Sequence, residues 1–96
     1  MEGAERQRSA ASHRGALPSL LATLDGLRDE ENALAHAKPR GGDQVALNAA
    51  RHATLAALLE YAAAIEALAW PVPRTILTEI KMHRILCDPR RHATDR

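Results

Sequence analysis

The chain has 96 residues, 46% of them hydrophobic, and a formal net charge of +1, and this length predicts at most one small domain. The near-neutral charge gives no strong field that would point to nucleic acid or a membrane surface. There is no Phe, one Trp and one Tyr, so the core must be built from Leu, Ile and Ala. Alanine has the highest helix propensity, and this composition therefore predicts an all-α fold.

Residues 1–15 are polar and lack hydrophobic periodicity, so the sequence predicts a flexible N-terminal tail without the apolar core of a signal peptide. The most apolar stretch, residues 53–70, is mostly alanine and contains Glu60 and Glu66, which argues against a membrane span. The single Cys87 cannot form an internal disulfide. We expect a cytoplasmic protein without membrane contact, and the bias towards Arg and Ala is typical of a GC-rich bacterial genome.

The first predicted helix spans about residues 18–38. Its leucines recur at steps of three, four and seven residues and form one apolar stripe, composed of Leu17, Leu20, Leu24, Leu27 and Leu34. Pro18 is tolerated in a first helical turn because its missing N–H would have no helical partner there. Pro39 and the glycines that follow it end the helix and supply a turn.

The second predicted helix spans about residues 43–70, from Asp43 as its N-cap to the stop imposed by Pro71 and Pro73. One apolar stripe runs along it, composed of Leu47, Thr54, Leu58, Tyr61, Ile65 and Leu68. The turn between the two long helices is short, which makes them antiparallel neighbours. The sequence therefore predicts a helical hairpin.

The rest of the second helix is mostly alanine, so it is apolar on more sides than a chain of this length can cover. An alanine face lets a second backbone approach closely, and pairing the hairpins of two chains would form a four-helix core. We expect a homo-oligomeric helical bundle. The alternative is that the alanine face stays in water, since alanine exposes little area.

The third predicted helix spans about residues 73–88, and residues 89–96 form a second predicted tail, so the folded domain covers residues 16–88. Residues 73–96 carry six bases and three acids, whereas residues 16–72 carry four bases and seven acids. Two interpretations remain open. The third helix packs its basic surface near the acidic hairpin, or the C-terminal third contacts an anionic partner.

Glu31 interrupts the leucine stripe of the first helix. In an antiparallel hairpin it lies level with the first turns of the second helix, where Arg51 flanks the apolar stripe. We expect Glu31 and Arg51 to form a partly buried ion pair that sets the hairpin register, with Asn48 and His52 able to complete the network. The alternative is a small-ligand or acid–base site built from these four residues.

Three potential zinc ligands share one face of the third helix, because Glu79, His83 and Cys87 are spaced four residues apart. Their spacing matches no standard zinc site, and a complete site would need ligands from elsewhere. Ile76 and Ile80 share the same face. We therefore expect His83 and Cys87 to be half-buried core residues, with Glu79 bonded to His83 and no metal bound.

No catalytic motif, cofactor fingerprint or standard metal spacing is present, so the sequence predicts no catalytic residue, no cofactor and no metal ligand. The leading hypothesis is a non-enzymatic helical module that binds itself and another protein through the hairpin. One alternative is a nucleic-acid-associated protein that contacts phosphates through the basic residues Arg74, Lys81, Arg84, Arg90 and Arg91. Another is a small-ligand-binding bundle or enzyme with a polar site near Glu31 and Arg51.

Overall fold

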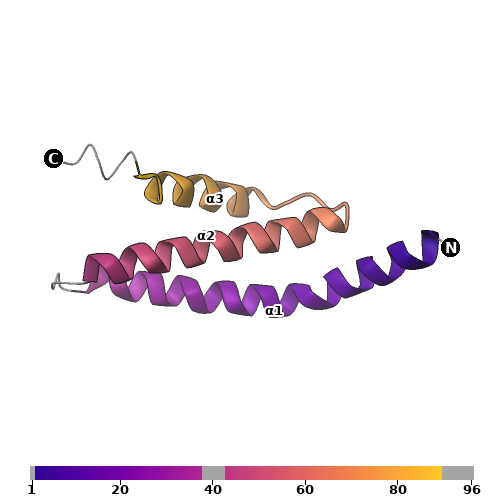
Figure 1. Cartoon of the computed structure of the whole chain (residues 1–96), viewed down its shortest axis with the longest axis horizontal. Helices are drawn as coiled ribbons and strands as arrows, with labels where there is room; N and C mark the ends of the chain where they lie inside the picture. Colours follow the sequence, from indigo (N-terminus) through magenta and orange to yellow (C-terminus); the bar gives the residue numbers. More distant parts are fainter. Residues whose placement is uncertain (1, 38–42, 90–96) are drawn as a thin grey trace.

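The computed structural model describes residues 2–37 and 43–89, with the backbone alone for residues 2–14 and 43. It contains three helices, α1 (Glu2–His36), α2 (Asp43–Ala67) and α3 (Arg74–Leu86). α1 and α2 pack along each other as an antiparallel hairpin, and the shorter α3 packs on α2 (Figure 1). The predicted all-α hairpin with a third, shorter helix is therefore confirmed. None of the described helices combines the length and hydropathy needed to cross a membrane.

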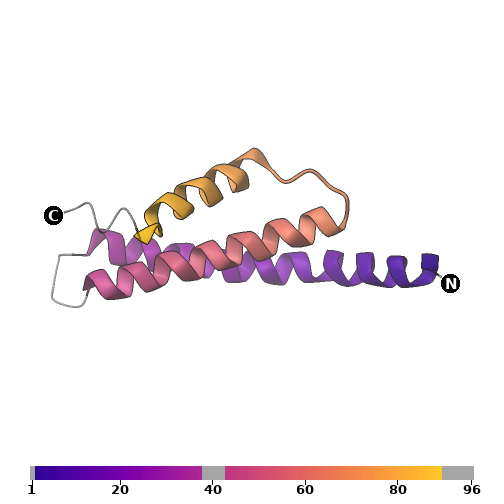
Figure 2. The ribbon, with the colours of Figure 1, turned by 45° about the horizontal axis from the view of Figure 1, so that its top comes forward.

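α1 is much longer than the helix over about residues 18–38 that the sequence predicts. It begins at Glu2, so residues 2–15, predicted as a flexible tail, are helical, and Pro18 lies inside the helix rather than in its first turn. Ala, Arg and Glu make up eight of the 14 residues of this segment, and these residue types favour helix without needing an apolar stripe. Its turns extend past the end of α2 (Figures 1 and 2). They are inclined to the rest of α1, as expected around an internal proline (Figure 1).

α2 begins at Asp43, as predicted, but ends at Ala67 rather than near Trp70. Ala69 adopts a left-handed conformation with φ of 58°. The Trp70 N–H donates to the carbonyl of Ile65 at 3.2 Å, and the Ala69 N–H donates to the carbonyl of Glu66 at 2.8 Å. This pair of hydrogen bonds is a Schellman motif, which closes the helix before either proline is reached.

α3 begins at Arg74, after Pro73, and ends at Leu86, two residues earlier than predicted. The Cys87 N–H closes its last turn by donating to the carbonyl of His83 at 2.9 Å. The predicted inter-helix turn over residues 38–42 lies outside the described residues, as does most of the predicted C-terminal tail.

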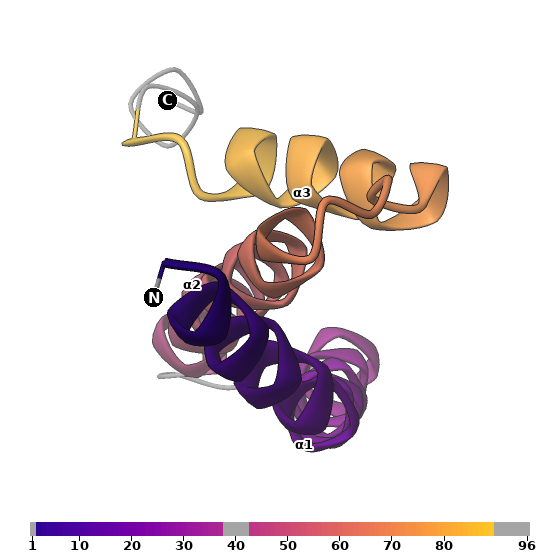
Figure 3. The ribbon, with the colours of Figure 1, turned by 90° about the vertical axis from the view of Figure 1, so that its right-hand side faces the viewer.

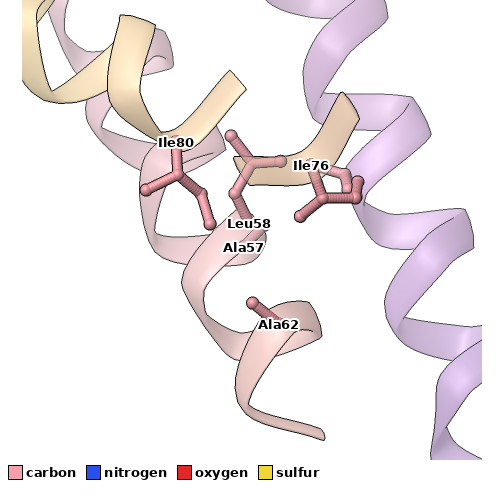
Figure 4. Packing of buried hydrophobic residues seen from close by; sticks show 6 residues of the cluster. Ala57, Leu58, Ala62, Ile76 and Ile80 are labelled. Carbon is pink, nitrogen blue, oxygen red and sulfur yellow. The ribbon is translucent and has the colours of Figure 1, made fainter. Parts of the chain in front are cut away.

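The core lies where the three helices meet. α2 runs between α1 and α3 (Figure 3). Leu24 of α1 and Leu58 of α2 are fully buried, and Ile76 and Ile80 of α3 pack against Leu58 and neighbouring alanines of α2 (Figure 4). The predicted stripe on α2 faces this core, because Thr54, Leu58 and Ile65 are buried and its other members are half-buried. This packing fixes which polar residues of α1 and α3 meet.

Candidate functional site

A largely buried contact between Glu31 and His83 joins α1 to α3. The Oε1 atom of Glu31 lies 2.8 Å from Nε2 of His83, and the Nδ1 atom of His83 lies 2.9 Å from the main-chain carbonyl oxygen of Glu79. The side chains are largely withdrawn from water, with 7% of His83 and 15% of Glu31 exposed. Both nitrogens of the imidazole ring are therefore engaged in the interior.

A second contact between the same two helices lies one turn away. The Arg28 guanidinium donates to both carboxylate oxygens of Glu79, from Nε at 2.9 Å and from Nη2. Its Nη1 donates to Asp25 at 3.0 Å. Burial by itself would lower the pKa of Arg28, but the hydrogen bonds and negative charge of Glu79 and Asp25 outweigh burial and raise it. Such two-pronged pairing adds geometric specificity, so it helps to fix α3 against α1.

The predicted ion pair between Glu31 and Arg51 is replaced by the pair between Glu31 and His83. Arg51 does not occur among the ion pairs of the described residues, and its Nε atom is buried without a hydrogen-bond partner. The physical reason is that α3 places the His83 imidazole against Glu31. Local sequence patterns do not encode how α3 docks.

The other two residues of that predicted cluster point elsewhere. Asn48 accepts a hydrogen bond from Gln44, one turn earlier on α2, at 3.2 Å. His52 is exposed. The structure therefore does not bring Glu31, Asn48, Arg51 and His52 together as one network.

The predicted face of α3 is present, with His83 buried and Glu79 and Cys87 half-buried. Glu79 does contact His83, but through its main-chain carbonyl, because its carboxylate pairs with Arg28. Burial raises the pKa of the Cys87 thiol, the charge of Glu31 raises it further, and the charge of Arg51 opposes both. A thiol with a raised pKa is a poor nucleophile and a poor metal ligand. Across residues 2–37 and 43–89, no group of three or more His, Cys, Asp and Glu residues could hold a metal ion.

Sequence reasoning missed the role of Arg28. The three-residue step from Asp25 to Arg28 is a spacing at which helical ion pairs form, and it could have drawn attention to this residue. Its main partner, Glu79, is 51 residues away in the sequence and becomes a neighbour only when α3 docks.

A hollow of about 340 Å³ opens beside these contacts, lined by Arg28, Glu31, Asn32, Glu79, Met82 and His83. The main charged groups around it are already paired with one another. Binding a polar ligand there would require breaking those pairs.

One side of α2 is left uncovered by the rest of the described chain. Its exposed residues recur at alternating steps of four and three, and we name them the open face: Val45, Ala49, His52, Ala56, Leu59, Ala63 and Glu66. Trp70 follows just beyond the helix. Val45, Leu59 and Trp70 are 74%, 38% and 46% exposed. A single chain thus leaves an alanine-rich surface uncovered, as the sequence predicts.

The outer side of α3 also carries exposed apolar residues, among them Leu77 and Ile85, which are 52% and 53% exposed. They line a shallow hollow of about 440 Å³ together with Ile80, Lys81, Arg84 and Asp88. Of the bases considered for phosphate binding, Arg74, Lys81 and Arg84 are exposed on α3, and the other two lie outside the described residues.

Comparisons of the chain with models of protein families, with curated proteins and with solved structures found no match.

Proposed function

We propose that this chain is a non-enzymatic helical module that self-associates through the open face of α2. The observation that carries the proposal is the alternating step of four and three residues between the exposed, mostly apolar positions along this helix. That spacing keeps one seam on the same side of a helix and is the pattern into which a second helix packs. Contiguous exposed apolar surface is also typical of interaction sites.

The order of polar groups along the open face favours a second copy as the partner, in antiparallel orientation. His52 lies in its N-terminal half and Glu66 at its C-terminal end. Antiparallel pairing with the two-fold axis near Leu59 places His52 of each copy near Glu66 of the other, whereas parallel in-register pairing places Glu66 against Glu66. A two-fold axis repeats each favourable contact, as in isologous dimers. The alanines between these residues allow a close approach of the two backbones.

The geometry of the buried contacts supports a non-enzymatic role. Glu31 and His83 are paired with each other, and Glu79 is held by Arg28. The raised pKa of the Cys87 thiol keeps it protonated near neutral pH. These residues serve as connections between helices in the proposed module.

The test is the mass in solution, measured by size-exclusion chromatography with light scattering at micromolar concentration. We expect twice the chain mass of 10.4 kDa. Ala63→Glu should give monomers, because it places a charge in the seam, while its helix content by circular dichroism stays unchanged, because Ala63 is exposed in the single chain. The matched control is Ala22→Glu on the exposed side of α1, which should remain dimeric.

Charge reversal tests the orientation. His52→Glu should weaken the dimer, and adding Glu66→His to it should restore the dimer by exchanging the two partners. A parent mass near 10.4 kDa throughout the micromolar range, or a dimeric Ala63→Glu variant, would contradict the proposal.

A further inference from the structure

The His83 ring makes two contacts with acceptor oxygens, one from each ring nitrogen. A neutral imidazole and a charged carboxylate together hold one proton too few for both contacts to be hydrogen bonds. A main-chain carbonyl oxygen only accepts hydrogen bonds, so the Nδ1 atom facing Glu79 must carry a proton. A neutral imidazole has only one N–H, which leaves a lone pair on Nε2. That lone pair would face the Glu31 carboxylate at 2.8 Å, where two acceptors repel. A second proton, on the ring or on the carboxyl group, turns the repulsion into a hydrogen bond.

We infer that the contact between Glu31 and His83 is a proton-dependent clasp, which holds α3 against α1 when it is protonated and weakens when the proton is lost. The pair contributes stability at low pH. That contribution is lost as the pH rises and the shared proton dissociates. The clasp is a property of each chain and does not depend on self-association through α2.

The charged groups around His83 come from all three helices. From α1, Arg28 is occupied by Glu79 and Asp25 and forms no ion pair with Glu31 in the described part of the chain. From α3 itself, Glu79 is held by Arg28, and the Cys87 thiol is neutral.

From α2, Arg51 lies close enough to influence the same region electrostatically, since its charge and that of Glu31 both act on Cys87. The positive charge of Arg51 attracts the Glu31 carboxylate and repels a protonated imidazole ring. It does not supply the missing hydrogen bond, because it forms no ion pair with Glu31 in the described ranges.

α3 depends on such contacts for its position. It has 13 residues, a length at which an isolated helix is marginal in water. Its buried isoleucines, Ile76 and Ile80, lie in its N-terminal half. The C-terminal half is tied to α1 through His83, so loss of the proton should loosen that half first.

The experiment compares urea unfolding at about pH 5.5 and about pH 8, on either side of the ordinary imidazole titration, at a fixed protein concentration. We expect the unfolding equilibrium constant of the parent to rise about tenfold with pH, from the loss of one charge-assisted hydrogen bond. His83→Gln should remove this rise. The control His36→Gln, at an exposed histidine of α1 outside the open face, should retain it.

Glu31→Gln is the decisive variant, because it has the same shape but removes the negative charge that makes the contact require a second proton. The amide N–H of the new glutamine can donate to the lone pair of a neutral Nε2, while Nδ1–H still donates to the Glu79 carbonyl. With a protonated ring the amide can turn and accept from Nε2–H through its oxygen, so this variant should lose the rise of the unfolding constant with pH that the parent shows.

A direct readout in the parent is nitrogen NMR of the His83 ring, with amide hydrogen exchange along α3. We expect a proton shared between Nε2 and Glu31 at low pH, and faster exchange of the C-terminal half of α3 at high pH. The clasp is excluded if Glu31→Gln keeps the pH profile of the parent, or if His83→Gln leaves that profile unchanged.

Discussion

Thr54 is fully buried on α2, and its hydroxyl donates to the carbonyl of Ala50 at 2.9 Å. That carbonyl also belongs to the helical hydrogen-bond ladder, so removing the hydroxyl leaves no buried group without a partner. A weaker contact of 3.5 Å reaches the carbonyl of Leu27 on α1. The hydroxyl is therefore satisfied mainly within its own helix, while the shape of the side chain fills the contact with α1.

This arrangement predicts different effects for two substitutions of Thr54. Thr54→Val keeps the shape and should change the free energy of unfolding by less than about 1 kcal/mol. Thr54→Ala also leaves a cavity and should cost about 1–2 kcal/mol. Urea unfolding of both variants measures the difference. If valine costs as much as alanine, the bond from Thr54 to α1 contributes more than the packing.

At the scale of whole elements, the end of α2 directs the chain back towards α3. The turn that follows the helix requires a left-handed residue, and the sequence supplies Ala69, with φ of 58°. A Cβ atom in this region is unfavourable, whereas glycine adopts it freely. α2 therefore ends with local strain that the docking of α3 must offset.

We expect Ala69→Gly to stabilise the protein by about 0.5–1 kcal/mol, because it relieves the strained φ in the folded state. Ala67→Gly is the matched control. It lies two residues earlier, at the last helical position of α2, where glycine relieves no strain and should instead cost up to about 0.5–1 kcal/mol. Thermal and urea unfolding measure both effects. Destabilisation by Ala69→Gly would mean that this alanine is not strained in solution.

At the scale of the whole molecule, the fold is elongated, with extents of 57 × 24 × 20 Å. α2 lies between its two neighbours, and the side opposite the core has no cover from the described residues (Figure 3). A chain of this shape buries a small share of its surface by itself. A second copy across the open face would bury the side that intramolecular packing leaves in water.

If the copies associate as proposed, unfolding is linked to dissociation. The midpoint of thermal unfolding should then rise with protein concentration, by mass action. Ala63→Glu should remove this dependence, and Ala22→Glu should keep it. Circular dichroism melts over a wide concentration range measure the effect. A midpoint independent of concentration in the parent would contradict self-association.

Several features could be predicted from the sequence because they depend on neighbours along the chain. The leucine spacing of the first helix and the stripe containing Leu58 predict the hairpin and which sides of it face the core. The alanines of the second helix predict its open face. The helix over residues 2–17 also depends on neighbours along the chain. The helix propensity of its residues predicts it, whereas hydrophobic periodicity does not.

Tertiary structure decided which polar groups meet. From the sequence, Glu31 faced Arg51 across a hairpin, and His83 belonged to a separate face of the third helix. The docking of α3 joined the two sets, since Glu31 and His83 are 52 residues apart in the sequence and 2.8 Å apart in space. The position of α3 follows from how Ile76 and Ile80 fit among Leu58 and the alanines of α2. Helices and hairpins leave periodic patterns in the local sequence. Shape complementarity between distant segments leaves no such pattern, so it is decided only in the folded chain.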